Sequence, residues 1–166
     1  MFQHILVPLD GSTFAEAALD PALALAKAFQ SRLTLVRIVP HPQIVLSEYT
    51  YEVADLFMEL RTAAVKDAEE YLKAQQGSLS QQGYEVRYQV IEGDNVAEWL
   101  LDVAESGDVD TLIMSTHGRS GLQRWVFGSV AEKVIRQARI PVLLVRPTAA
   151  AETTLVETPA VSAETA

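Results

Sequence analysis

Short apolar runs alternate with helix-like segments along most of this 166-residue chain. Runs with the length and composition of buried strands lie at residues 5–9, 33–39, 84–90, 110–116 and 142–145. Segments with helical spacing of apolar residues lie between them, at residues 13–29, 53–76, 94–104 and 129–138. This alternation is typical of a parallel, doubly wound sheet. We therefore expect one α/β domain, in which helices flank a five-stranded parallel sheet.

Local signals place the first elements. Pro8 cannot donate to a sheet ladder, so it should lie at the end of the first strand. Thr13 and Glu16 have the spacing of a capping box and should open the first helix. An interior proline removes a helical hydrogen bond, so we expect this helix to bend at Pro21.

Later elements are predicted from their apolar spacing. The helix from about Val53 to Gln76 should end at a polar break, Gly77 to Gly83, and a connector over residues 43–52 precedes it. Its expected core face is formed by Leu56, Leu60, Ala63, Ala64, Tyr71 and Leu72. Asp94 or Asn95 should cap the next helix. The side chains expected to face inward from that helix are Val96, Trp99, Leu100 and Val103.

The topology indicates where a ligand would bind. Doubly wound sheets bind ligands outside the carboxyl ends of their strands, at the point where the strand order reverses. The first strand ends at Asp10 and the fourth at Thr116. In the Rossmann-like order 3-2-1-4-5 these two strands are neighbours. Asp10 and the segment that follows Thr116 should then share one crevice.

That segment, residues 114–130, carries Gly118, Gly121 and Gly128, and it leads from a strand into a helix that starts near Ser129. Glycines let backbone N–H groups approach a ligand closely. A helix N-terminus adds unpaired N–H donors and the positive end of a dipole. The segment is therefore a candidate phosphate site. It matches neither the Walker pattern nor the Rossmann G-x-G-x-x-G pattern.

Composition excludes several classes of function. The formal net charge of −9 argues against a nucleic-acid binder, whose surface is usually basic. The absence of cysteine excludes disulfides and thiol chemistry. We expect no membrane span and no secretory signal, and hence a cytoplasmic protein. Residues 148–166 are rich in Ala, Thr, Glu and Pro, and are predicted to form a flexible tail outside the domain.

The residues at both ends of the domain resemble the universal stress protein family. The similarity is carried by Ile5–Ser12, by Ser115–Gly121 with Gly128–Glu132, and by Ile140–Val145. It spans residues 1–147. The ATP-binding branch of that family has the pattern G-x2-G-x9-G-[S/T], which Gly118, Gly128 and Ser129 match. The first glycine of the pattern is replaced by Ser115, whose side chain could crowd the ligand or donate a hydrogen bond to it.

The resemblance implies a site for ATP or a related adenine nucleotide. Pro8 and Asp10 would line the nucleoside end, with Asp10 bonding ribose hydroxyls, and the backbone of Ile38 would contact adenine. The residues implied around ribose and phosphates are Ser115, His117, Gly118, Arg119, Ser120, Gly121, Gly128, Ser129, Val130 and Ala131. Mg²⁺ would accompany the nucleotide through its phosphates rather than through a protein cage.

Simpler structural roles remain open for several of these residues. Ser129 and Glu132 also have capping-box spacing, so Ser129 could serve only its own helix. Asp10 could be a turn residue before Gly11, and His117 could pack beneath the glycines. Arg119 could form salt bridges instead of binding phosphate.

Three functions are consistent with the sequence. The first is a nucleotide-binding signalling or regulatory module of the stress response. The second is a slow ATP hydrolase, although no general base, nucleophile or metal triad is evident. The third is a dimeric stress protein that has lost its ligand. A homodimer is expected because Val142–Val145 is an apolar strand at the sheet edge, and such edges pair with other chains.

Overall fold

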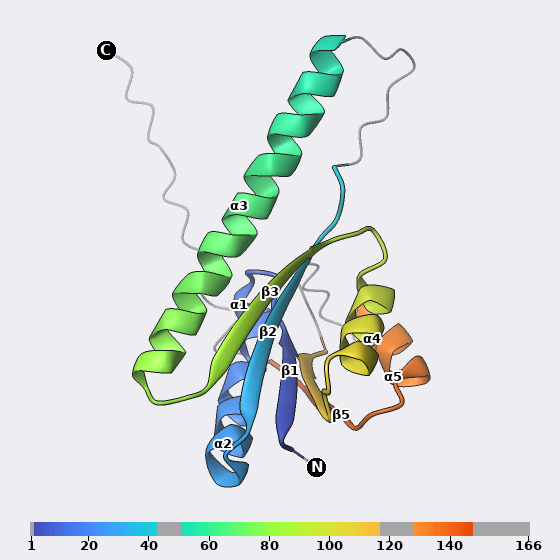
Figure 1. Cartoon of the computed structure of the whole chain (residues 1–166). Coiled ribbons are helices and arrows are strands. Elements are labelled where there is room, and N and C mark those ends of the chain that lie inside the picture. Colours follow the sequence, from blue (N-terminus) through green and yellow to red (C-terminus); the bar gives the residue numbers. More distant parts are fainter. Residues whose placement is uncertain (1, 43–50, 117–127, 148–166) are drawn as a thin grey trace, which may run out of the picture.

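The predicted topology is confirmed in a computed structural model, which describes residues 2–42, 51–116 and 128–147. All the strand pairs are parallel, and the sheet has the order β3-β2-β1-β4-β5 (Figure 1). The strands are β1 (His4–Pro8), β2 (Arg32–Val39), β3 (Val86–Glu92), β4 (Thr111–Ser115) and β5 (Val142–Val145). The helices are α1 (Thr13–Glu16), α2 (Leu19–Phe29), α3 (Tyr51–Gln81), α4 (Val96–Ser106) and α5 (Ser129–Gln137).

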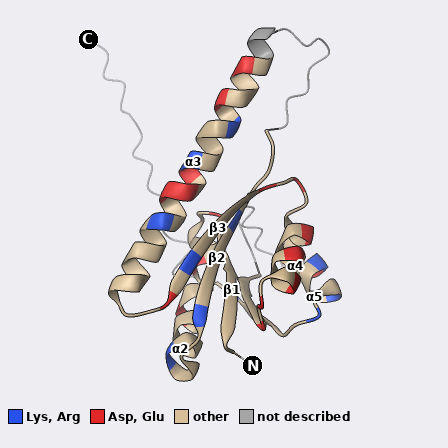
Figure 2. Ribbon diagram, in the orientation of Figure 1, with Lys and Arg blue, Asp and Glu red and all other residues tan. Residues whose placement is uncertain are grey.

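Alternating side chains of β1 enter two hydrophobic layers. Ile5 and Val7 pack with residues of α1, α2 and α3, whereas Leu6 packs with residues of α4 and α5. The central strand is thus buried on both faces, which explains its continuous apolar sequence. Figure 2 shows that the charged residues lie mostly on the helices and loops, and β1 carries none of them.

The beginning of the first helix differs from the capping-box prediction. Its N-cap is Ser12, whose hydroxyl accepts a hydrogen bond from the amide of Ala15 at 3.2 Å. Asp10 holds Ser12 in place by accepting from its amide at 2.9 Å and its hydroxyl at 2.6 Å. The carboxylate of Glu16 is engaged elsewhere, since it accepts the phenol proton of Tyr71 at 2.7 Å.

Pro21 coincides with the expected interruption of this helix. The helix is divided into α1 and α2, and Ala17 and Ala18 lie between them. Pro21 falls in the first turn of α2, where its missing N–H leaves no helical bond unmade.

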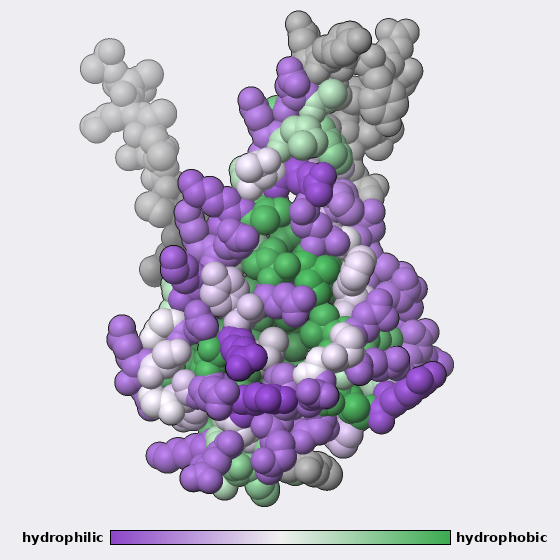
Figure 3. Space-filling view, in the orientation of Figure 1, coloured by the Kyte–Doolittle hydropathy of each residue, from purple (hydrophilic) through white to green (hydrophobic). Residues whose placement is uncertain are grey.

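Helix α3 is longer than predicted, and its core face is shorter. Gly77 lies within the helix, so the polar break expected there is wrong. Leu72 is buried as predicted, but Leu56 and Leu60 are 51% and 47% exposed. A helix of 31 residues is about 46 Å long, whereas the seven residues of β3 span about 23 Å. The N-terminal part of α3 therefore projects past the sheet, and apolar side chains are visible on it (Figures 1 and 3).

Two expectations for α4 are also wrong. Trp99 is 39% exposed rather than inward, and its indole covers Gly93, where an added Cβ would lie 1.9 Å from the ring nitrogen. Asn95 occupies the N-cap position, but its side chain makes no bond to the helix, and its Oδ1 accepts from the ammonium group of Lys133 at 3.2 Å. Asp94 accepts from the amide of His41 at 2.9 Å. Leu100 is buried as predicted. Within the described ranges, no helix is long and apolar enough to cross a membrane.

His4 should make the stability of the fold depend on pH. The imidazole is buried and lies 2.7 Å from the hydroxyl of Thr34. Burial, assisted by the charge of Arg32, lowers the pKa of His4 below its ordinary value of 6.5. Folding therefore favours the neutral ring, and this stabilisation is complete above pH 6.5 and is lost as the pH falls toward the folded pKa.

The urea concentration at the unfolding midpoint of the wild type should consequently decrease when the pH is lowered from about 7.5 to about 5.5. In His4→Gln this decrease should be smaller. Both proteins retain His41. The difference between the slopes of their urea midpoints against pH therefore reports on His4 alone. Identical slopes would contradict the assignment.

Candidate functional site

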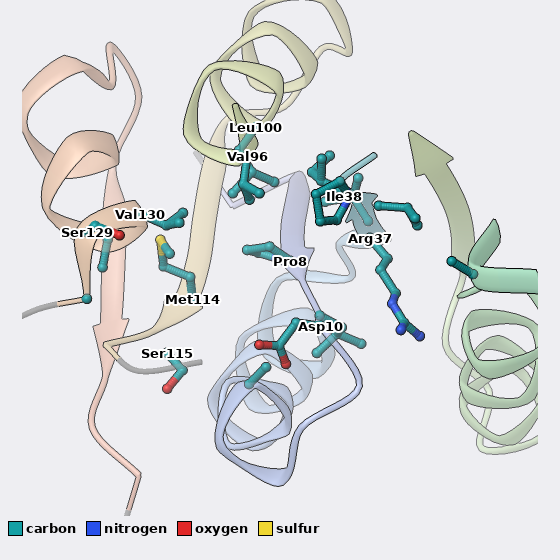
Figure 4. A pocket seen from close by; sticks show the side chains of 18 of the residues that line it. Pro8, Asp10, Arg37, Ile38, Val96, Leu100, Met114, Ser115, Ser129 and Val130 are labelled. Carbon is teal, nitrogen blue, oxygen red and sulfur yellow. The ribbon is translucent and has the colours of Figure 1, made fainter. Parts of the chain in front are cut away.

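A cavity of about 780 Å³ lies at the carboxyl end of the sheet. The ends of β1, β2 and β4 form its floor, and α3, α4 and α5 contribute to its walls (Figure 4). β1 pairs with both β2 and β4, so this is the point where the strand order reverses. Asp10, Thr116 and Gly128 line this cavity together, as the topology predicted, whereas residues 117–127 of the predicted crevice lie outside the described residues.

Asp10 and Ser115 supply polar groups at one side of this cavity (Figure 4). Gly11 has a φ of 84°, a conformation that favours glycine, and it turns the chain directly after Asp10. The carboxylate of Asp10 accepts the amide of Ser12 in this turn, so Asp10 is a turn residue. It also lines the cavity, and the two roles are compatible. Ser115 is the last residue of β4 and is buried.

The first turn of α5 brings backbone donors to the cavity. Gly128 is the N-cap, and its carbonyl accepts the amide of Glu132 at 2.9 Å. The amide of Gly128 donates to the carbonyl of Thr116 at 3.0 Å. The amides of Ser129, Val130 and Ala131 are the next three, and such first-turn amides have no acceptor within their own helix. They also lie at the positive end of the helix dipole.

The proposed capping box of Ser129 and Glu132 is not formed. The cap is Gly128, and the carboxylate of Glu132 binds Arg136 at 2.9 Å one turn later. Ser129 is thus the first helical residue, and its exposed side chain lies beside the cavity (Figure 4).

Gly128 has a backbone conformation that any residue can adopt. Its φ is −58°, and among the described residues an added Cβ would meet only the carbonyl oxygen of Thr116, at 3.4 Å. The backbone therefore does not require glycine here. A side chain at this position would instead occupy space at the N-terminus of α5, beside the cavity.

Apolar side chains line the opposite part of the cavity. They come from five elements, and Figure 4 shows them as Pro8, Ile38, Val96, Leu100, Met114 and Val130. This division into an apolar part and a polar part suits a ligand with one apolar and one polar end.

Sequence reasoning missed Arg37, Asp67 and His41, which also line the cavity. The guanidinium of Arg37 binds Asp67 on α3 at 3.0 Å. It also lies 5.5 Å from the ring centroid of Tyr71. Burial and the neighbouring Glu16 raise the pKa of the Tyr71 phenol, so it remains a proton donor. One signal was present in the sequence, since a charged residue within the apolar run 33–39 must find a partner.

The predicted site residues fall into two groups. Eight line the cavity: Pro8, Asp10, Ile38, Ser115, Gly128, Ser129, Val130 and Ala131. The other five, His117, Gly118, Arg119, Ser120 and Gly121, lie outside the described residues. The residues that the structure describes contain no cluster of three His, Asp or Glu residues that could hold a metal ion.

Fold and site together define a doubly wound α/β protein with a cavity at its topological switch point. The chain belongs to the universal stress protein family, whose model matches residues 1–146.

Its relatives include two universal stress proteins that are each 30% identical. MJ0531 of Methanocaldococcus jannaschii aligns over 147 residues, covering 88% of this chain and 83% of the relative. YxiE of Bacillus subtilis aligns over 149 residues, covering 88% of this chain and all of the relative.

Solved structures agree with the fold. The structure of MJ0577 has a TM-score of 0.76 at 28% identity, covering 89% of this chain and 98% of that chain. UspA from Lactobacillus plantarum has a TM-score of 0.75 at 22% identity, with coverages of 87% and 98%. A universal stress protein in complex with cAMP has a TM-score of 0.55 at 21% identity, with coverages of 89% and 98%.

Proposed function

We propose that this protein binds ATP or a related adenine nucleotide and acts as a signalling or regulatory module in the stress response. One observation carries the proposal: Asp10, Ser115 and the first turn of α5 converge on a cavity whose remaining wall is apolar. Membership of the universal stress protein family supports the stress-response role. A protein of the same fold has been solved with cAMP, so the fold is compatible with an adenine nucleotide.

The two parts of the cavity suggest how the nucleotide would lie. Adenine would contact the apolar wall near Ile38, and the carboxylate of Asp10 would accept hydrogen bonds from ribose hydroxyls. Phosphates would lie at the amides of Ser129, Val130 and Ala131, where the helix dipole favours an anion. In a chain with a net charge of −9, local backbone donors are a suitable means of holding an anion.

Mg²⁺ fits this site only as an ion carried by the nucleotide. Asp10 is the one carboxylate on the polar side of the cavity among the described residues, and one carboxylate does not form a protein cage. The ion would neutralise part of the phosphate charge. Asp10 would orient the ribose, and the α5 amides would hold the phosphate oxygens.

Isothermal titration calorimetry tests this proposal directly. Wild-type protein should bind ATP in the presence of Mg²⁺, and it should bind ATP more tightly than adenosine because the α5 amides contact phosphate. Mass spectrometry of ligand released from purified protein would identify a nucleotide that remains bound through purification. No binding by calorimetry and no released nucleotide would contradict the proposal.

Ser115→Gly should tighten ATP binding mildly. The change removes the Cβ and hydroxyl where the first glycine of the family pattern would stand, and this gives the ligand more room. If the hydroxyl instead donates to the nucleotide, the change should weaken binding by roughly 0.5–1.5 kcal/mol. Titration of both proteins with ATP decides between these outcomes, and a loss of affinity would reject the crowding explanation.

We also propose that two copies associate through β5. This strand pairs with β4 on one side and forms the edge of the sheet on the other. Leu143 is 40% exposed there, whereas Leu144 packs against the layer of α4 and α5. A twofold pairing of two such edges would satisfy the open backbone groups and cover Leu143.

A further inference from the structure

Arg37 lies in the cavity wall across from the first turn of α5 (Figure 4). Its side chain is 9% exposed. Among the described residues it is the only Lys, Arg, Asp or Glu that is buried. A buried charge must be compensated by partners, so its surroundings show what the cation does.

The contacts of Arg37 use only part of its hydrogen-bonding capacity. One Nη donates to Asp67 at 3.0 Å, and one face of the guanidinium lies over the ring of Tyr71. A guanidinium has five N–H donors. The remaining donors of Arg37 form no hydrogen bond with another described residue, and Arg37 itself borders the cavity.

The position of Arg37 in the sheet places it near the nucleoside end of the proposed nucleotide. β2, β1 and β4 are adjacent, so the ends of β2 and β4 are separated by two strand spacings, about 10 Å. Arg37 is on β2, and the α5 amides follow β4. A nucleotide with its phosphates at α5 would therefore direct its nucleoside end toward Arg37.

The charges around Arg37 do not favour a second phosphate there. Asp10 and Asp67 also line the cavity, so two carboxylates accompany this single guanidinium. Asp67 already accepts one of its N–H groups. The local charge is thus compensated, and the remaining donors suit a neutral acceptor such as a base nitrogen or a ribose oxygen.

We propose that Arg37 is a specificity-determining residue that donates a hydrogen bond to the nucleoside end of the ligand. The inference rests on the proposed function and adds a recognition role at the β2 side of the same cavity. Asp67 holds one N–H group of the guanidinium, and the ligand would use the others. If the ion pair of Arg37 and Asp67 only held β2 to α3, the loss of either residue would weaken binding equally. If Arg37 binds the ligand, the loss of Arg37 matters more.

This difference gives the experiment. Calorimetry would compare wild type, Arg37→Met and Asp67→Asn with adenosine, AMP, ADP and ATP. Arg37→Met should weaken all four ligands by a similar factor, roughly 10- to 100-fold, because a hydrogen bond from a charged donor is lost. Asp67→Asn should weaken binding much less than Arg37→Met does, because the guanidinium and its unused donors remain in place. Asp67 is 72% exposed, so this control disturbs little packing.

Other results would overturn the inference. Equal losses in Arg37→Met and Asp67→Asn would indicate a structural bridge, and a loss that grows with phosphate number would indicate a phosphate partner. Unchanged binding in Arg37→Met would exclude any role in recognition. Circular dichroism of each variant shows whether it is folded. If Arg37→Met does not fold, Arg37→Gln takes its place. Wild-type protein that binds none of the four ligands would overturn both this inference and the proposed function.

Discussion

Gly128→Val should reduce the affinity for ATP by at least about 100-fold. The valine methyl groups would occupy the space at the N-terminus of α5 and keep phosphate from the amides of Ser129 and Val130. The φ of −58° allows a side chain, and the carbonyl of Thr116 is the one group of the described chain that an added Cβ would meet. The fold should therefore survive the change, with a loss of roughly 1 kcal/mol at the cap. Calorimetry with ATP and Mg²⁺ measures the effect.

Two comparisons make this result specific. Adenosine has no phosphate, so its affinity should change little in Gly128→Val. Gly77→Val places the same side chain in α3, where an added Cβ would meet nothing within 4 Å, and it should bind ATP like the wild type. Unchanged ATP affinity in Gly128→Val would rule out phosphate binding at this helix N-terminus.

Leu143→Lys should convert a homodimer into a monomer. A charged side chain on the exposed side of β5 opposes edge-to-edge pairing. Leu144 packs against the hydrophobic layer of α4 and α5, so its replacement would destabilise the fold itself. Light scattering coupled to size-exclusion chromatography would show the mass falling by half.

Met58→Lys is the matched control for the dimer experiment. Met58 is 53% exposed on α3, away from β5, so its charge should leave the dimer intact. A monomeric wild-type protein at micromolar concentration, or a Leu143→Lys protein that remains dimeric, would show that β5 is not the interface.

The sequence predicted the parts of the fold that depend on local pattern and on topology. Apolar runs located the strands, and the strand order placed Asp10 beside Thr116, because the carboxyl ends of adjacent parallel strands meet at one edge. The glycines before a helix start, together with the resemblance to the family's nucleotide-binding pattern, identified Gly128 and Ser129 as candidates for the cavity wall. Their position there is now seen, whereas their contact with a nucleotide stays a prediction.

The remaining errors concern contacts between distant segments. Helical periodicity gave α3 an apolar face, but it contains no information on how far the sheet extends beneath Leu56 and Leu60. The partnership of Arg37 with Asp67 joins residues 30 positions apart, and no local pattern specifies it. Similarly, the capping box of Thr13 and Glu16 is not formed, because Ser12 caps the helix and the Glu16 carboxylate accepts the phenol proton of Tyr71 on α3.

The position of β1 in the middle of the sheet determines the order in which its two edges can pair while the chain is synthesised on the ribosome. β1 can pair with β2 once the first forty residues have emerged, but its other edge stays open until β4 is made, at Thr111. A nascent chain therefore carries a central strand with one open edge until about two thirds of the chain have been made, and such edges are prone to aggregation. The cavity is completed later still, because its last wall is the start of α5. A nucleotide bound there would stabilise only the finished domain and could not assist the folding of its first two thirds.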